Sequence, residues 1–73
     1  MLEIVRQKYG RHVDTRVYVD LGYGEMEVDV EEIEMIDGEL SGMAYCHQRE
    51  IEMHVDHRDC ERALAKFEKE NEQ

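Results

Sequence analysis

Five side chains that can bind a transition metal fall within fifteen residues of this 73-residue chain: Cys46, His47, His54, His57 and Cys60. Imidazole nitrogens and thiolates are ligands that zinc prefers. Structural zinc sites, however, are built from two close pairs such as C-x2-C and H-x3–5-H, and the spacing here fits neither. We therefore expect no metal or other cofactor. The candidate ligands of the alternative, a small zinc-binding domain, are Cys46, His47, His57 and Cys60.

Nucleophilic catalysis has few candidate groups. Ser41 is the only serine, and neither it nor a cysteine has a histidine partner that the spacing reveals. Carboxylates are plentiful, but no lysine lies near them to support phosphoryl chemistry. A chain of this length also offers little concave volume for a substrate. We expect that the protein is not an enzyme.

Carboxylates between positions 24 and 38 alternate with apolar residues, the pattern of a strand with one buried and one exposed face. The alternation shifts by one residue at Glu31-Glu32. A β-bulge there would keep Ile33 and Met35 on the buried face and the acids on the other. We call the exposed acids the acidic row: Glu25, Glu27, Asp29, Glu31, Glu32 and Glu34.

Neighbouring stretches predict the strands that would surround this row. Residues 13–21 also alternate, and the G-Y-G at 22–24 suits a hairpin loop. Asp37-Gly38 predicts a type I′ turn, whereas Ser41-Gly42 predicts a bulge or a break. Residues 43–47 and 51–55 then read as two further strands.

Both ends of the chain carry weaker or different patterns. Residues 2–9 fit a strand or a helix, and the β-branched pair Ile4-Val5 favours the strand. A helix over about 57–70 follows from a stripe of apolar residues, with Asp56 or Asp59 as its cap. The stripe consists of Cys60, Ala63, Leu64 and Phe67.

These elements predict one α+β domain over residues 1–73. An antiparallel meander of about four strands, within about residues 2–56, is covered by the single C-terminal helix. Because the core of so small a unit is thin, we expect a homodimer. The two cysteines cannot form the multi-bridge framework of a small secreted fold, so we expect them to be reduced.

The net charge of −10 is distributed unevenly, since residues 17–48 hold nine acids and no base. Direct binding to nucleic acid or to an anionic membrane needs clustered Lys and Arg, which this stretch lacks. The charge instead favours docking onto a basic protein, with the acidic row imitating phosphates and Tyr18 and Tyr23 as aromatic anchors. Four further acids could add to the row, depending on strand order: Asp14, Asp20, Glu50 and Glu52.

In its size, acidity and expected sheet, the chain resembles phage-encoded inhibitors and DNA mimics, anti-CRISPR proteins among them. This resemblance covers the length and charge of the whole chain and has no sequence motif. It implies an inhibitor or decoy that masks a basic, nucleic-acid-binding surface. Two alternatives are an oligomeric assembly subunit and a charged face that only keeps a small sheet soluble.

Localisation follows from two features of the sequence. No apolar run reaches the roughly 18–20 residues of a transmembrane helix. The N-terminal residues lack the apolar core of a signal peptide. We therefore expect a cytoplasmic protein, or one in the host-cell cytoplasm if a phage encodes it.

Overall fold

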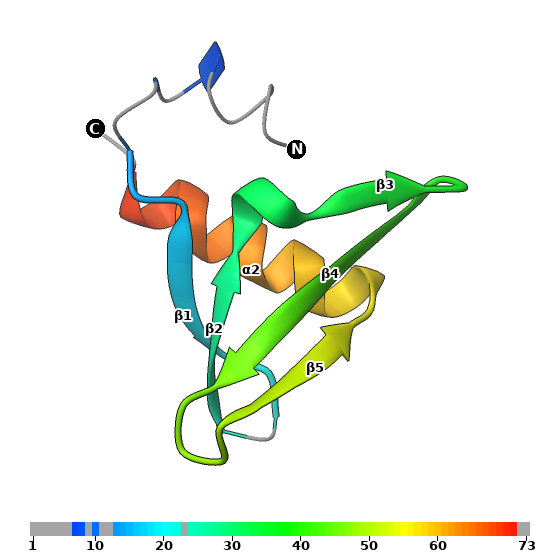
Figure 1. Cartoon of the computed structure of the whole chain (residues 1–73). Coiled ribbons are helices and arrows are strands. Elements are labelled where there is room, and N and C mark those ends of the chain that lie inside the picture. Colours follow the sequence, from blue (N-terminus) through cyan, green and yellow to red (C-terminus); the bar gives the residue numbers. More distant parts are fainter. Residues whose placement is uncertain (1–6, 9, 11–12, 23, 72–73) are drawn as a thin grey trace.

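The computed structural model describes residues 7–8, 10, 13–22 and 24–71, and these form an antiparallel sheet packed against one C-terminal helix (Figure 1). The elements are β1 (Arg16–Asp20), β2 (Glu25–Asp29), the 3-10 turn η1 (Val30–Glu32), β3 (Glu34–Ile36), β4 (Glu39–Cys46), β5 (Ile51–Val55) and α2 (His57–Glu70). The predicted α+β fold is confirmed. Of the strand predicted over 2–9, only Gln7 and Lys8 are described, and both are helical; its other residues lie outside the described part of the chain.

The sheet has five strands because the long acidic strand is divided into β2 and β3. Val28 of β2 lies opposite Ala44, and Glu34 of β3 lies opposite Ser41, so the β2–β3 side uses three more residues than β4 does. Those residues form η1, where the sequence predicted a bulge of one residue. If β2 and β3 are taken as one interrupted strand, the order is the expected meander, with β5 on the other edge of β4 (Figure 1).

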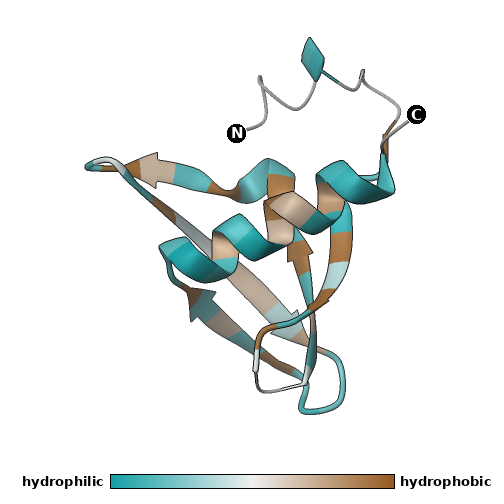
Figure 2. Cartoon of the chain, turned by 180° about the vertical axis from the view of Figure 1, so that it is seen from behind, coloured by the Kyte–Doolittle hydropathy of each residue, from teal (hydrophilic) through white to brown (hydrophobic). Residues whose placement is uncertain are grey.

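The core lies between the sheet and α2, as Figure 2 shows from the helix side. The apolar stripe of the helix packs on β1, β4, β5 and η1, with Cys60, Ala63 and Phe67 fully buried. Asp56 caps the helix, since its side chain accepts a hydrogen bond from the backbone N–H of Asp59. Within the described residues, no helix has the length and apolar content that crossing a bilayer demands.

Met35 departs from the prediction. It was expected to share the buried face with Ile33, and Ile33 is indeed buried, but Met35 is 59% exposed and its neighbour Ile36 is 52% exposed. The reason is the extent of the helix: the tip of the β3–β4 hairpin reaches beyond α2 (Figure 1). A side chain on the inner face of the sheet is buried only where another layer covers it.

Two glycine-containing features were predicted in this region: the turn at Asp37-Gly38, which is confirmed, and a bulge or break at Ser41-Gly42, which is wrong. Asp37 and Gly38 both have positive φ, 51° and 81°, as a type I′ turn requires. Ser41-Gly42 is not a break, because β4 runs through it without interruption. Gly42 faces α2, and a Cβ atom there would lie 3.3 Å from Ile33 and 3.5 Å from the sulfur of Cys60. The glycine therefore permits close packing of the helix on the strand.

Candidate protein interface

The face of the sheet turned away from α2, which we call the outer face, carries the acids and several aromatic rings. The strand register places Tyr18 of β1 opposite Glu27 of β2, Glu27 opposite Tyr45 of β4, and Tyr45 opposite Glu52 of β5. We call these four residues the cross-strand row. Rings and carboxylates therefore alternate across the sheet, which the sequence did not predict because it did not establish the register.

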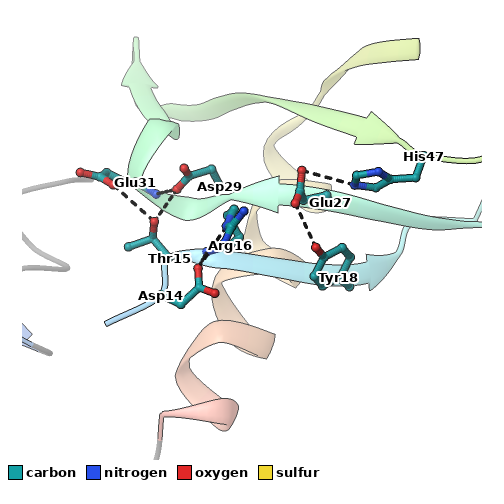
Figure 3. Close-up of polar contacts among 8 residues, drawn as sticks. All are labelled: Asp14, Thr15, Arg16, Tyr18, Glu27, Asp29, Glu31 and His47. Carbon is teal, nitrogen blue, oxygen red and sulfur yellow. Dashed lines mark hydrogen bonds and ion pairs between the residues drawn. The ribbon is translucent and has the colours of Figure 1, made fainter. Parts of the chain in front are cut away.

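Glu27 lies at the centre of the outer face and is held by two neighbours (Figure 3). The Tyr18 hydroxyl donates a hydrogen bond of 3.1 Å to Oε1, and Nε2 of His47 lies 3.5 Å from Oε2. The side chain of Glu27 is 20% exposed, whereas the ring of His47 is largely open to solvent and packs edge-on against Tyr45. The hydrogen bond to Glu27 raises the pKa of Tyr18 above its ordinary value. Glu27 is therefore an oriented carboxylate rather than a freely rotating one.

Asp29 and Glu31 have structural roles in addition to their charge. The Asp29 carboxylate accepts hydrogen bonds from the Thr15 hydroxyl at 2.7 Å and from the backbone N–H of Glu31 at 3.0 Å (Figure 3). Glu31 also accepts from the Thr15 hydroxyl, at 3.3 Å. Asp29 thus caps η1, the turn that interrupts the predicted row.

The other members of the acidic row are exposed. Glu25 lies on β2 opposite Asp20, Glu32 lies in η1, and Glu34 lies on β3 opposite Ser41. A shallow hollow of about 200 Å³ is lined by Glu27, Asp29, Glu32, Tyr45 and Glu52, together with Arg16, Met43 and Ala44. The turn therefore breaks the row as a straight line but gathers Glu32 with acids of β2 and β5. Tyr23, the second predicted anchor, lies outside the described residues.

Charge is separated between the two layers of the molecule. Residues 16–55, which contain the sheet, hold eleven acids and two bases, whereas α2 holds four acids and four bases. Of the two bases in the sheet region, Arg16 is bonded through Nε to Asp14 at 3.3 Å. The backbone N–H and then the guanidinium of Arg16 hold the pKa of Asp14 below its ordinary value. The negative field is thus concentrated on the sheet.

The candidate metal ligands are distributed over different parts of the fold. Cys46, the last residue of β4, is buried in the core, whereas His47, in the turn that follows, is exposed. Nδ1 of His57 accepts a hydrogen bond from the Leu40 backbone N–H at 2.8 Å. Cys60 is buried on the helix stripe, and burial raises the pKa of its thiol. In the described part of the chain, no three His, Cys, Asp or Glu side chains are grouped as a metal site.

One contact between a serine and a histidine was not predicted from the sequence. The Ser41 hydroxyl lies 2.8 Å from Nε2 of His54 on the outer face. Register explains it, because Ser41 and His54 occupy adjacent strands, β4 and β5. A nucleophile also needs a group that orients its base. No carboxylate among the described residues hydrogen-bonds the second ring nitrogen of His54.

Comparison with known proteins returned no relatives: no protein-family model, curated protein or solved structure matches this chain. The geometry of the outer face therefore carries the functional argument. Two of its residues were not predicted there: Tyr45 was missed as a site residue, and His47 was considered only as a metal ligand. The signal was present in the sequence, since strand alternation over 43–47 places both on the same face.

Proposed function

We propose that this chain is a small acidic interaction module whose outer sheet face docks onto a basic, nucleic-acid-binding protein and masks its binding surface. The observation that carries the proposal is the separation of charge: eleven acids and two bases in the sheet region, against a neutral helix. A face kept only for solubility usually mixes charges of both signs.

The spacing of the acids suits a partner that binds phosphates. Side chains on one face of a strand repeat every ~6.6–6.8 Å, and neighbouring strands add charges ~4.8 Å to the side. Glu25 and Glu27 on β2 and Asp20 on β1, opposite Glu25, supply such an array, and Glu52 on β5 adds a charge two strands away from Glu27, beyond Tyr45 of β4. Attraction between complementary fields accelerates association and makes it sensitive to salt.

The test begins by capturing a partner with the immobilised chain from extracts of the organism that encodes it. The captured protein is then purified, and its affinity is measured with and without competing duplex DNA. We expect the chain and DNA to exclude each other and affinity to fall steeply with salt, because the Debye length is only ~8 Å at physiological ionic strength. Simultaneous binding of chain and DNA would contradict masking.

A matched pair of variants locates the interface. Glu25→Lys with Glu34→Lys changes two exposed acids of the outer face, and Glu68→Lys with Glu70→Lys changes two exposed acids of α2 by the same charge. We expect the sheet variant to lose partner binding and the helix variant to keep it. Equal loss in both variants would show that net charge alone matters, and unchanged binding in the sheet variant would exclude the outer face.

Exposed apolar residues at the hairpin tip support a second function, an assembly subunit. Met35 and Ile36 are both more than half exposed, although large side chains of this kind usually pack in a core. They lie on opposite faces of β3, Met35 on the inner face opposite Leu40 and Ile36 on the outer face, and a second copy of the chain that packs around the hairpin tip could cover both. Association that depends on these two residues, and not on the acids of the outer face, would favour this function.

A further inference from the structure

The cross-strand row has a composition that charge alone does not explain. Tyr18, Glu27, Tyr45 and Glu52 follow one another on adjacent strands, so the backbone of each ring-bearing residue is one strand spacing, about 4.7–4.9 Å, from that of a residue with a carboxylate. A solvated face needs charge but has no need of rings between the charges. An alternation of rings and carboxylates suits a ligand that is cationic and flat.

Glu27 and the hollow beside it have capacity for such a ligand. Each oxygen of Glu27 has one close neighbour, Tyr18 or His47, and a carboxylate offers about four lone-pair sites. The hollow of about 200 Å³ places Tyr45 and Glu52 next to Glu27. Arg16 of the chain itself borders this hollow, and its guanidinium is tied to Asp14 on the β1 side.

Arginine and lysine side chains of a partner would bind this hollow differently. A guanidinium is planar, presents five N–H groups, stacks on aromatic faces and is weakly hydrated, whereas an ammonium is a compact and strongly hydrated charge. We propose that the hollow receives an arginine side chain of the partner, which stacks on Tyr45 and donates to Glu27 and Glu52. This inference rests on the proposed function, because the arginine belongs to the protein on which the outer face docks.

Two peptides of equal charge test the site with the full-length chain. Labelled hexa-arginine and hexa-lysine are titrated at low salt against the wild type, Tyr45→Phe and Tyr45→Leu. We expect the wild type to favour hexa-arginine by at most about two- to fivefold, the size of a cation–π contact at an exposed site, because the planar, weakly hydrated guanidinium stacks on the ring better than the ammonium does. Tyr45→Phe keeps the ring and the preference, while Tyr45→Leu binds both peptides equally.

The outcomes separate this inference from the proposed function. Equal binding of the two peptides by the wild type, or an unchanged preference in Tyr45→Leu, overturns the arginine site. The absence of a preference in the wild type overturns the site even if Tyr45→Leu does not fold. Glu25→Lys with Glu34→Lys should weaken the binding of both peptides alike and leave the ratio of their affinities intact. If the peptides are not distinguished but this double variant still loses the captured partner, the arginine site fails and the acidic interface stands.

Discussion

At the scale of single residues, the acids of the outer face differ in how tightly they are held. Glu27 and Asp29 are fixed by hydrogen bonds, whereas Glu25, Glu32 and Glu34 are exposed. Fixed carboxylates present charge in one geometry and lose little conformational entropy on binding. Exposed ones contribute chiefly to the long-range field. Mutations in the two groups should therefore have different consequences.

The Tyr18–Glu27 hydrogen bond predicts a stability effect at alkaline pH. The pKa of Tyr18 is raised in the folded state, so the neutral phenol that donates to Glu27 is favoured there. Its stabilising contribution is complete below the unfolded pKa of about 10 and is lost as pH rises through the higher folded pKa. Urea unfolding of the wild type and Tyr18→Phe should show a difference near pH 8 that shrinks above pH 10 and is lost once the pH exceeds the raised pKa of the folded state. A constant difference would contradict the assignment.

His57 predicts a second effect, on the hairpin that carries β3. Because a backbone N–H can only donate, Nδ1 of His57 must accept from Leu40, and Nε2 then carries the proton that faces Glu61. His57→Ala leaves that N–H without its acceptor and should cost about 1 kcal/mol of unfolding free energy. His57→Asn places an oxygen near the position of Nδ1 and should cost less. Equal losses in urea titrations would refute this role.

At the scale of elements, two local devices shape the sheet. Asp29 caps η1 and thereby ends β2, while Gly42 lets α2 approach β4. Both are single residues whose effect is to place whole elements. The first divides the acidic strand, so that Glu32 joins the acids of β2 around the hollow. The second brings the helix onto the sheet and closes the core.

A larger side chain at Gly42 should cost more stability than the substitutions at Tyr18 and His57. Gly42→Val inserts a branched side chain where a Cβ alone would lie 3.3 Å from Ile33. Overpacking of this kind costs about 1–3 kcal/mol. Met43→Val, one residue further on the exposed outer face, is the matched control and should change stability little. Thermal melts of the two variants give the comparison, and equal melting temperatures would show that the helix can move aside.

At the scale of the whole molecule, the concentration of negative charge on the sheet opposes folding. Self-repulsion destabilises a compact state of high net charge, and salt screens it, with a Debye length of ~30 Å at 0.01 M and ~10 Å at 0.1 M. The melting temperature should therefore rise between these two concentrations of NaCl. The rise should be smaller in Glu25→Lys with Glu34→Lys than in Glu68→Lys with Glu70→Lys, which removes the same charge from the helix. Equal rises would mean that the charge of the sheet is not the destabilising feature.

The homodimer remains a prediction, and the structure suggests where it would form. Met35 and Ile36 are exposed on β3 at the hairpin tip, and burial of apolar surface contributes about 25 cal/mol per Å². Sedimentation at micromolar concentration should show a dimer that Ile36→Lys dissociates. A single 8.7 kDa species at high concentration would rule it out.

The sequence by itself determined the elements that depend on local physics. Strand alternation, the Asp37-Gly38 turn, the helix of residues 57–70 and a cap at either Asp56 or Asp59 were all predicted, because periodicity, positive φ and capping act over a few residues. The structure uses Asp56. It also indicated which acids face away from the core, since alternation alone assigns each side chain to one of the two faces of a strand.

Tertiary structure alone decided how those elements combine. The exposure of Met35 depends on where the helix ends over the sheet. The 3-10 turn η1 stands in place of the predicted bulge, and Asp29, which caps it, also accepts a hydrogen bond from Thr15, the residue before β1. Register across four strands brought Tyr45 and Glu52 beside Glu27, and Ser41 beside His54. These contacts join residues distant in the chain, and a pattern of period two specifies which face a side chain occupies but not which partner lies opposite it.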